Sequence, residues 1–474
     1  MSQFYSFKYS VGIVLFGLLV NSTQSVVGFQ AEVPESLAAG LAQITEGRVT
    51  ATISFLASDE MAGRGTPSSD FNIAAAYVAA RFRGAGLKGG GTEGSYFQET
   101  MMRMGQTPNS GLLFETADQR PIKHFGLLTG GESDCEFSGN LTVAELAKDF
   151  AEEKLSGVIA GKFAGNATGG RAFSQLARLA NTLEAAGATA LVLYVAEDSE
   201  LIRLAEQGRD KARLENPRSR LSLPILLAAG EPVADQKINI RLPKQVVTEL
   251  PMRNVIGVLP GSDPELAKEA VLFTAHLDHL GARAGVGDGV FNGADDDASG
   301  VTGVLSLADA FVALPDRPKR SVVFMTFWGE ESGLLGSRQF AAEPTWPLEK
   351  ITANVNIEMI GRPEPGASGK IWMTGWQESN LGVLMNEASS KFGVDIFDHP
   401  KFSAMLYRSS DNWSFVEKGV IAHSFSAGSL HADYHQPDDE WERLEIPHMT
   451  RVIQGLFIGA QPLTTGSATP EKKK

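Results

Sequence analysis

Five residues with metal-binding side chains each end an apolar stretch or lie in the loop that follows one. They are His276, Asp296, Glu331, Glu358 and His435. Two imidazoles and three carboxylates form a nitrogen and oxygen donor set that suits zinc or a similar divalent ion. One catalytic zinc ion usually takes three protein ligands, whereas five ligands fit two ions that share a bridging carboxylate. The set therefore predicts a site for two divalent metal ions, with zinc favoured.

The first of these residues, His276, has an acidic neighbour two positions later, Asp278, in the segment F-T-A-H-L-D-H-L-G. Residues two apart in a strand point to the same side. We therefore expect the Asp278 carboxylate to accept the second ring N–H of His276, which fixes the tautomer and raises its basicity as a ligand. His279 is expected to face the other way and to pack or support a ligand. A structural histidine paired with an aspartate would give the same local pattern.

Three consecutive carboxylates occur in G-A-D-D-D-A-S-G, at the start of a predicted helix. Helix capping accounts for one or two of them. It does not account for all three, because their mutual repulsion requires a nearby cation. We expect Asp296 to be the bridging ligand, and Asp295 and Asp297 to cap the helix or support the ligand.

Glu330 and Glu331 close an apolar strand, where two acidic residues are costly unless they are paired or bound to metal. Adjacent side chains diverge, so Glu331 can bind a metal while Glu330 reaches a water molecule. A glutamate beside zinc-bound water, whose pKa falls to about 7, suits hydrolysis at neutral pH. Glu330 is therefore the expected general base. Glu358 closes another apolar strand, although an ion pair with Arg362 would also explain its position.

The last candidate, His435, lies in the loop segment H-A-D-Y-H-Q-P-D-D-E-W. His423, His431 and His448 compete with it for the same role. A loop histidine is usually solvated, so the assignment of His435 depends on the other four ligands.

Bulk properties limit the class of protein. At 474 residues the chain exceeds one ordinary core, so two domains or one large decorated domain are expected. Apolar residues make up 43%, which excludes a disordered chain. The formal net charge of −14 argues against binding nucleic acid or an anionic membrane through a basic face. The single cysteine, Cys135, excludes an intrachain disulfide and a cysteine-built zinc site.

The N-terminus has the pattern of an export signal. Lys8 is the only charge before the apolar run 11–20, and polar and small residues follow. This run is too short to cross a bilayer core of about 30 Å. We expect residues 1–31 to be a cleaved signal peptide, the protein to be exported to the periplasm or outside the cell, and no membrane span to remain. An uncleaved N-terminal anchor is the alternative.

The rest of the chain divides by composition and by the pattern of apolar residues into four expected parts. Residues 35–109 read as the first part of a catalytic domain, 110–250 as an inserted α+β domain, 251–463 as the main catalytic domain, and 464–474 as a disordered tail. The insert holds none of the five candidate ligands. Its clearest helix is expected over 171–186.

In the main catalytic part, buried-strand patterns alternate with helical ones. Strands are expected over 271–277, 321–328, 352–359, 370–373 and 420–425. Helices are expected over 298–313, 332–341, 377–392 and 446–460. This alternation predicts a three-layer α/β/α fold around a mostly parallel sheet. In such sheets ligands bind beyond the carboxyl ends of the strands, where the candidate ligands fall.

Four motifs occur together and in a fixed order: H-x-D, G-A-D-D-x-A-S-G, E-E-x-G-L-x-G-S and Y-H-x-x-D-D. An earlier segment, S-D-E-M-A-G-R-G, accompanies them. Together they resemble the co-catalytic zinc exopeptidases, a family that includes secreted bacterial aminopeptidases, glutamate carboxypeptidase and the transferrin receptor ectodomain. The resemblance covers roughly 45–105 and 250–460.

The resemblance implies a division of the ligands between two zinc ions. Asp296 would bridge them, one ion would also bind His276 and Glu358, and the other would bind Glu331 and His435. It further implies a cis peptide bond after Asp296.

The resemblance also implies roles for residues outside the ligand set. The chain differs from the family pattern at two positions. Glu330 would activate the water, and Tyr407, in L-Y-R-S-S-D-N-W, would stabilise the oxyanion. Glu358 stands where many aminopeptidases have aspartate, and Asn412 stands where histidine is common. The insert lies where some relatives carry a protease-associated domain.

The expected function is that of an aminopeptidase acting on peptides with a free N-terminus. A carboxypeptidase or dipeptidase on the same scaffold is the first alternative, and Arg362 and Arg408 are its candidates for binding a terminal carboxylate. A glutaminyl-cyclase-like acyl transferase is disfavoured, because that branch works with one zinc ion. A non-catalytic binding module would have lost ligands, and none of the five is missing. The residue preference and the oligomeric state are not indicated.

Overall fold

The computed structural model describes most of the chain from residue 34 onward. The described residues are 34–106, 111–122, 125–129, 134–146, 150, 154–162, 170–197, 202, 213–214, 223–283 and 287–473. The predicted signal peptide, 1–31, lies outside them. Within these ranges, no helix combines the length and the apolar character that crossing a membrane requires.

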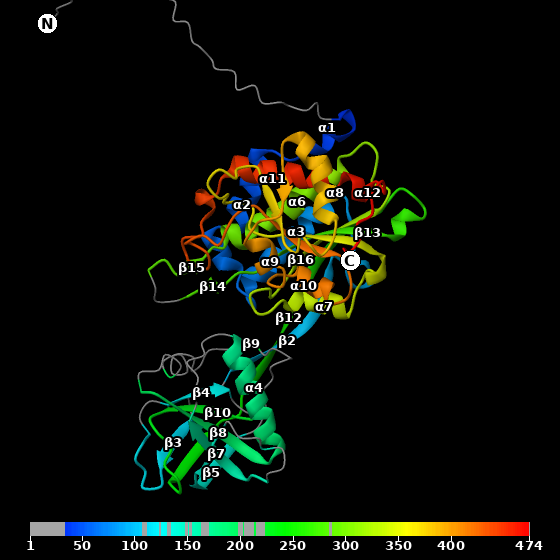
Figure 1. Ribbon diagram of the computed structural model, residues 1–474. Helices are drawn as coiled ribbons and strands as arrows, with labels where there is room; N and C mark the ends of the chain where they lie inside the picture. The colour runs from blue at the N-terminus through cyan, green and yellow to red at the C-terminus, as the bar shows by residue number, and fades with distance from the viewer. Residues whose placement is uncertain are drawn as a thin grey trace, which may run out of the picture.

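A ten-stranded sheet forms the centre of the larger part of the molecule (Figure 1). Its four central strands are parallel and lie in the order β20 (Ala422–Ser426), β17 (Ile351–Ile357), β13 (Ala270–His276) and β16 (Ser321–Phe327). Each matches an apolar run expected from the sequence within about two residues. The expected α/β fold with a parallel centre is confirmed.

Antiparallel strands extend the sheet on both sides. Beyond β16 follow β12 (Val246–Leu259), β2 (Phe97–Gln106) and β9 (Arg213–Leu214), and β1 (Lys88–Gly89) pairs with β12. Beyond β20 lies β18 (Ile371–Met373), antiparallel to it, followed by β19 (Ile396–Phe397).

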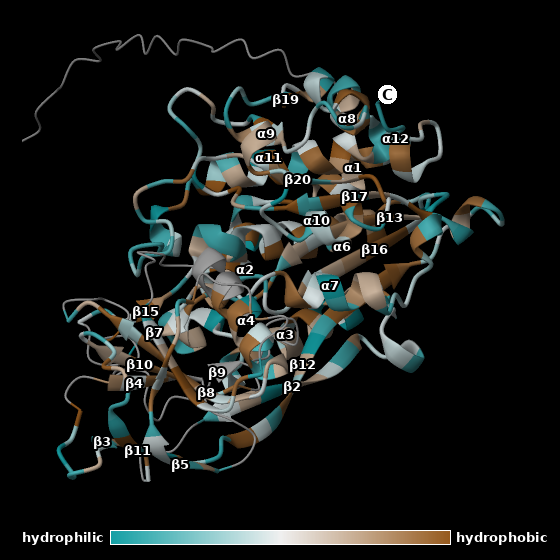
Figure 2. Cartoon of the chain, turned by 60° about the horizontal axis from the view of Figure 1, so that its bottom comes forward, coloured by the Kyte–Doolittle hydropathy of each residue, from teal (hydrophilic) through white to brown (hydrophobic). Residues whose placement is uncertain are grey.

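Side chains alternate between the two faces of the sheet and bury both. In β13, Val271, Phe273 and Ala275 face one hydrophobic cluster, while Ala270 and Leu272 face another. The first cluster is covered by α1 (Glu35–Leu41), α2 (Glu46–Leu56), α3 (Ser69–Ala85), α6 (Gly300–Val312), α8 (Leu381–Ser389) and α11 (Ile446–Gly459). The second is covered by α7 (Leu335–Ala342) and α10 (Asn412–Val416). This produces the three layers, and Figure 2 shows the hydrophobic colour concentrated on the central strands.

Two smaller sheets lie in the segment expected to be an insert. One has the order β4 (Phe125–Thr129), β10 (Ile225–Ala229), β8 (Ala188–Val195), β7 (Gly157–Lys162) and β6 (Thr142–Val143). The other has the order β3 (Leu113–Thr116), β11 (Lys237–Leu242) and β5 (Cys135–Asn140). With α4 (Gly170–Ala185) they enclose hydrophobic clusters of their own.

The long strands β2 and β12 run between the larger part and these smaller sheets as one antiparallel ladder, from Phe97↔Val255 to Gln106↔Val246. The boundary expected at 250/251 therefore falls inside β12. The segment V-V-T-E-L-P-M-R-N has no continuous apolar run, so the sequence gives no sign that a strand continues through it. The division into domains remains a prediction.

The C-terminal residues differ from the expected disordered tail over 464–474. Arg320 donates hydrogen bonds to the carbonyl of Ala468 at 3.1 Å and to the hydroxyl of Thr469 at 2.8 Å. A short polar segment looks solvated by composition, but here its backbone is held by a buried arginine. The disordered-tail prediction is therefore wrong for residues 465–473.

Candidate metal centre

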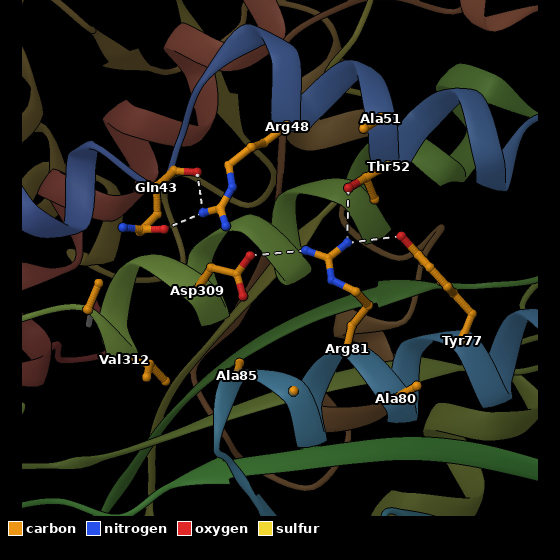
Figure 3. Close-up of a pocket in the computed structure, with 12 residues that line it drawn as sticks. Gln43, Arg48, Ala51, Thr52, Tyr77, Ala80, Arg81, Ala85, Asp309 and Val312 are labelled. Carbon is orange, nitrogen blue, oxygen red and sulfur yellow. Dashed lines mark hydrogen bonds and ion pairs between the residues drawn. The ribbon is translucent and has the colours of Figure 1, made fainter.

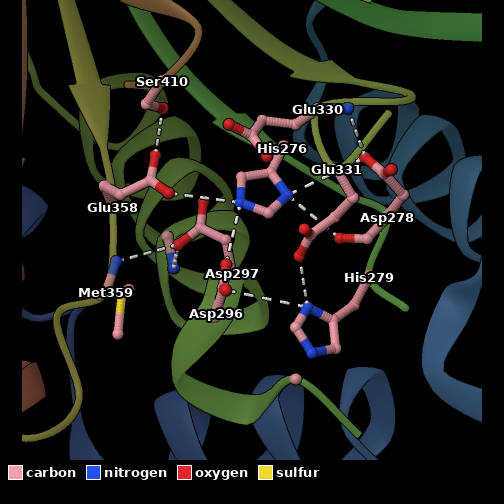
Figure 4. A network of polar contacts seen from close by, with 12 residues as sticks. His276, Asp278, His279, Asp296, Asp297, Glu330, Glu331, Glu358, Met359 and Ser410 are labelled. Carbon is pink, nitrogen blue, oxygen red and sulfur yellow. Dashed lines mark hydrogen bonds and ion pairs between the residues drawn. The ribbon is translucent and has the colours of Figure 1, made fainter. Parts of the chain in front are cut away.

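The predicted ligands gather at the carboxyl end of the parallel strands, and Figure 4 shows His276, Asp296, Glu331 and Glu358 there. His276 is the last residue of β13, Glu331 follows β16, and Glu358 follows β17. Asp296 lies in the turn Ala294–Ser299 that leads into α6, and His435 lies in the loop after β20. Parallel strands end at one edge of the sheet, so residues far apart in sequence converge there.

One group of three ligands surrounds His276. Its Nε2 atom lies 3.0 Å from Oδ1 of Asp296 and 3.3 Å from Oε1 of Glu358. His276 donates its other ring N–H, at Nδ1, to the carbonyl oxygen of Asp278 at 3.0 Å. In the neutral ring, a proton at Nδ1 leaves the lone pair of Nε2 directed at the two carboxylates, as metal binding requires.

A second group shares the same aspartate. Nε2 of His435 lies 3.1 Å from Oδ2 of Asp296 and 3.3 Å from Oε2 of Glu331. The two oxygens of Asp296 therefore face different imidazoles, which is the arrangement of a bridging carboxylate. The structure brings all five predicted ligands together, and their division between two ions stays a prediction.

His279 also belongs to this centre, contrary to the expected direction of its side chain. Its Nδ1 atom lies 2.8 Å from Oε1 of Glu331 and 3.9 Å from Oδ2 of Asp296. The strand ends at His276, so the alternation of side chains no longer applies three residues later. The repeated histidine in H-L-D-H was the available signal. His279 and His435 are alternative nitrogen donors on the same side of Asp296.

The unpartnered buried atoms of the centre test whether metal ions fit. Within the described residues, His276 Nε2, His279 Nδ1, Glu331 Oε1 and His435 Nε2 have no hydrogen-bond partner. Their close neighbours lie within about 3.3 Å but do not have hydrogen-bond geometry, as expected for lone pairs that converge on a cation. Buried polar atoms without partners are costly. The residues therefore fit two divalent ions.

The charge of the centre supports the same conclusion. Burial, and then the nearby Glu358, Asp411 and Glu331 carboxylates, raise the pKa of Glu330 well above its usual value, although His276 opposes this. An ionised Glu330 therefore needs added positive charge nearby. Two divalent ions would supply it.

Asp278 supports the centre differently from the expectation. Its carboxylate is 3.8 Å from Nδ1 of His276, and it is the backbone carbonyl that accepts that ring N–H. The carboxylate instead accepts the backbone N–H of Glu330 at 3.1 Å. The chain turns after β13, which brings the carbonyl under the ring. Asp278 therefore fixes the backbone of the predicted base.

The acidic residues around the bridge hold backbone groups. Asp297 Oδ1 accepts the N–H groups of Gly300 and Met359, both at 3.1 Å, so it caps α6 and anchors the segment after β17. Asp295 Oδ1 accepts the N–H of Gly361 at 2.7 Å. The expected capping role is confirmed for Asp297, whereas Asp295 holds the segment after β17, and the Asp296–Asp297 peptide is cis as the resemblance implied.

Ser410 and Asn356 are supporting residues that the sequence did not single out. The Ser410 hydroxyl and the Asn356 amide both donate to Oε2 of Glu358, at 2.5 Å and 3.1 Å. Asn412, where the family often has histidine, donates instead to the carbonyl of Tyr407 at 2.9 Å. Its contacts are structural.

Two tyrosines differ in what surrounds them. The Tyr407 ring stacks on His423, with centroids 5.4 Å apart. Burial and then Glu378 raise the pKa of Tyr407 to about 12. Neither neighbour is a predicted ligand, so the oxyanion role of Tyr407 stays a prediction without a geometric argument.

Tyr434 lies beside the candidate metal centre, in contact with His435. Its ring stacks on that of His435, with centroids 3.9 Å apart. Burial raises the pKa of its hydroxyl, and so do the carboxylates of Asp296, Glu331 and Glu358. The residue lies directly before a predicted ligand in Y-H-Q-P-D-D, which was the signal that could have identified it.

The competing residues lie beside other groups. His431 Nε2 lies 3.2 Å from Oδ2 of Asp295, His423 is hydrogen-bonded with Ser379, and His448 accepts a backbone N–H. Arg362 pairs with Asp433 at 2.7 Å, so an ion pair with it does not explain the position of Glu358.

Comparison with known proteins finds a family match within the main catalytic part of the chain. Residues 254–457 match the model described as Peptidase family M28. The resemblance to zinc exopeptidases is confirmed by this match, and a zinc metallopeptidase is thereby supported at the level of the family.

Individual proteins resemble the chain in fold or over part of its sequence. A solved aminopeptidase from Aneurinibacillus sp. strain AM-1 is similar in fold, with a TM-score of 0.55 and 19% identity over 90% of this chain and 95% of that one. A vacuolar membrane protease of Candida dubliniensis is 22% identical over 46% of this chain and 22% of its own length. The leupeptin-inactivating enzyme 1 of Streptomyces exfoliatus is 32% identical over 24% of each chain. The chain thus spans about a quarter or less of these two relatives.

The comparisons contradict the predicted location. The fungal relatives from Candida dubliniensis, Yarrowia lipolytica and Candida tropicalis are vacuolar membrane proteases, not periplasmic or extracellular proteins. The prediction of export to the periplasm or medium, drawn from the N-terminal pattern alone, is therefore wrong on this evidence.

Proposed function

Taking the match of residues 254–457 to peptidase family M28 as the premise, we propose that the protein is a zinc-dependent aminopeptidase. The observation that carries the proposal is the pair of imidazole and carboxylate groups that share Asp296, with Glu330 beside them. One ion would be held by His276, Asp296 and Glu358. The other would be held by Asp296 and Glu331 with His435, and His279 lies close enough to supply a further nitrogen.

Glu330 is proposed to move the proton. When bound, the two zinc ions would lower the pKa of water and polarise the scissile carbonyl. Glu330 accepts a proton from the attacking water and delivers it to the leaving amine. Its backbone N–H is fixed by the Asp278 carboxylate at 3.1 Å, which limits where the base can reach.

Tyr434 is proposed to stabilise the developing negative charge on the carbonyl oxygen. Its ring is held against His435, and its hydroxyl lies within the electrostatic influence of the carboxylates of the centre. A phenol so placed can donate a hydrogen bond to an oxyanion, where such donors contribute most. Tyr407 is the alternative donor that the sequence suggested.

The surrounding charges favour an aminopeptidase over a carboxypeptidase. Arg362 is paired with Asp433, and Arg443 lies 3.0 Å from the same carboxylate. The Arg408 guanidinium lies over the ring of Trp413, 4.8 Å from its centroid. Arg362 and Arg408, the two candidates for binding a substrate carboxylate, thus both contact other side chains of the protein. The carboxylates of the centre, in contrast, suit a substrate with a free α-amine.

We also infer that residues 110–250 form a separate protease-associated-like domain. Its support is that its two sheets enclose hydrophobic clusters of their own. It would limit substrate access or contact a partner.

The proposal is tested with wild type, Glu330→Gln and the remote, exposed control Glu265→Gln. Bound metal is measured, and activity is assayed on aminoacyl-nitroanilides and on N-blocked versions of the same compounds. We expect about two metal ions per chain in all three proteins, cleavage only of free-amine substrates, and loss of activity in Glu330→Gln alone. Metal-free wild type without turnover would indicate a binding module. Cleavage only of peptides with a free C-terminus would indicate a carboxypeptidase.

A further inference from the structure

One buried arginine has no part in the proposed chemistry. Arg64, in the loop S-D-E-M-A-G-R-G, is 0% exposed. Its guanidinium donates four hydrogen bonds, all to backbone carbonyls: Nε to Leu277 at 2.9 Å, Nη1 to Leu56 at 2.6 Å and Asn292 at 2.8 Å, and Nη2 to Gly293 at 2.9 Å. A charged side chain is almost never fully buried unless it is paired, so this pattern needs an explanation.

The four carbonyls belong to the segments that carry the metal ligands. Leu277 follows His276 directly, and Asn292 and Gly293 lie just before the bridging Asp296. Leu56 ends α2 and ties both segments to the surrounding helices. One rigid, planar group therefore spans the gap between the strand end and the turn that together supply ligands to both sites.

The backbone of Arg64 and Gly65 pairs in turn with the backbone of His279. The N–H of His279 donates to the carbonyl of Arg64 at 3.4 Å, and Gly65 forms a parallel bridge with His279. Ala62, Gly63 and Arg64 have successive positive φ values of 44°, 67° and 48°. Strained backbone of this kind persists only where surrounding contacts hold it, and it clusters at functional sites.

The loop also packs closely against the segments beside the centre. A Cβ atom on Gly63 would lie 2.3 Å from the carbonyl oxygen of Phe291 and 2.7 Å from that of Gly281. The glycine is needed both for its φ value and for this close approach. The loop therefore presses directly against the segment that precedes the bridging aspartate.

The charge of Arg64 faces the acidic centre without a direct ion pair in the described residues. Burial lowers the pKa of Arg64 to about 10, while Asp278, Asp297 and Asp439 act in the opposite direction. The guanidinium thus stays charged at neutral pH and offsets part of the repulsion among those carboxylates.

We propose that Arg64 is a positioning residue that fixes the spacing between His276 and Asp296, and with it the geometry of both metal sites. The inference rests on the proposed function. Lysine cannot replace it, because a single ammonium group cannot reach four carbonyls in the plane of a guanidinium. Residues that orient metal ligands typically change metal affinity by about 10- to 100-fold when they are lost.

The test compares Arg64→Lys and Arg64→Gln with the control Arg81→Gln. Like Arg64, Arg81 has several hydrogen-bond partners: Asp309, Tyr77 and Thr52, at 2.9–3.1 Å. Unlike Arg64, it lines a pocket between α2, α3 and α6 that contains no predicted ligand (Figure 3). Metal-free proteins are titrated with Co²⁺ alone, and the visible spectrum and both affinities are recorded. Thermal unfolding is followed with and without the ion.

We expect both Arg64 variants to lose about 10-fold or more in Co²⁺ affinity, with an altered spectrum, while Arg81→Gln keeps the wild-type spectrum and affinities. Equal affinities and spectra in all proteins would overturn the proposal. So would Arg64 variants that remain unfolded at saturating Co²⁺, because the arginine would then serve general stability. Wild type that binds fewer than two ions would instead contradict the proposed function.

Discussion

Removing the Ser410 hydroxyl should weaken one metal site and spare the other. Ser410 donates to Oε2 of Glu358 at 2.5 Å, and it accepts the Asn356 amide at 3.0 Å. Glu358 contributes to the group that contains His276, but not to the residues on the other side of Asp296, which are Glu331 with His279 or His435. Ser410→Ala therefore perturbs a single ligand of a single ion.

The expected size follows from the kind of hydrogen bond that is lost. A hydrogen bond to an ionised group contributes roughly 1.5–3 kcal/mol. Glu358 keeps its bond from Asn356 at 3.1 Å, so the lower end of the range applies. About 1.4 kcal/mol corresponds to a factor of ten, so affinity for that ion should fall by roughly 10-fold.

The assay is competition between the protein and a chelator for zinc, with the two binding steps resolved. Ser414→Ala is the matched control, because Ser414 is equally buried and its hydroxyl lies 2.8 Å from the neutral hydroxyl of Ser337. We expect the zinc affinity of one binding step to fall in Ser410→Ala, and the affinities of both steps to stay unchanged in Ser414→Ala. Equal binding by both variants, or equal weakening of both steps in Ser410→Ala, would refute the assignment of Glu358 to one ion.

Three further predictions concern pH, the oxyanion and the core. In the folded, metal-free protein, burial raises the pKa of Asp278 to about 7. Burial lowers the pKa of His435, but its contacts with Asp296 and Glu331 outweigh this and raise the pKa to about 10. Each group binds more protons in the folded than in the unfolded protein, so the unfolding temperature of metal-free protein should fall from pH 5 to pH 9 while the stabilisation by zinc grows; a flat profile in scanning calorimetry would contradict this. Tyr434→Phe should lower kcat by about 100-fold or more, while Tyr407→Phe stays within a few-fold of wild type in steady-state assays; the reverse order would restore Tyr407 as the donor. Phe273→Ala, which removes a fully buried ring stacked 5.8 Å from Phe324, should cost about 3–5 kcal/mol in denaturant unfolding yet leave the metal content unchanged.

The parallel centre of the sheet was predictable because its strands are buried on both faces. Such strands appear as continuous apolar runs, as in V-L-F-T-A-H and V-V-F-M-T-F, and their ends place ligands at one edge. Strand β12 was not predictable in the same way. It is an antiparallel strand whose outer half, V-V-T-E-L-P-M, is mostly exposed and has neither a continuous apolar run nor a regular alternation, so it resembles a loop with a proline at position 251.

The site was predictable where a residue's role follows from its own strand. Ser410 and Asn356 were missed because their bond partner, Glu358, is determined by how the segment around residue 410 packs against β17. Asp278 was assigned the right neighbour but the wrong atom, because strand alternation was extended past the end of β13. His279 was misplaced for the same reason. Local rules fail at the turn where the chain leaves the sheet, which is also where the chemistry is located.

The metal content of three substituted proteins tests the central claim most directly. Asp296 is proposed to belong to both sites, whereas Glu358 and Glu331 each belong to one. After dialysis against a weak chelator, the account predicts about two zinc ions in wild type, about one in Glu358→Gln and in Glu331→Gln, and none in Asp296→Asn. An Asp296→Asn protein that keeps one tightly bound zinc ion would contradict the shared carboxylate, and with it the proposed centre.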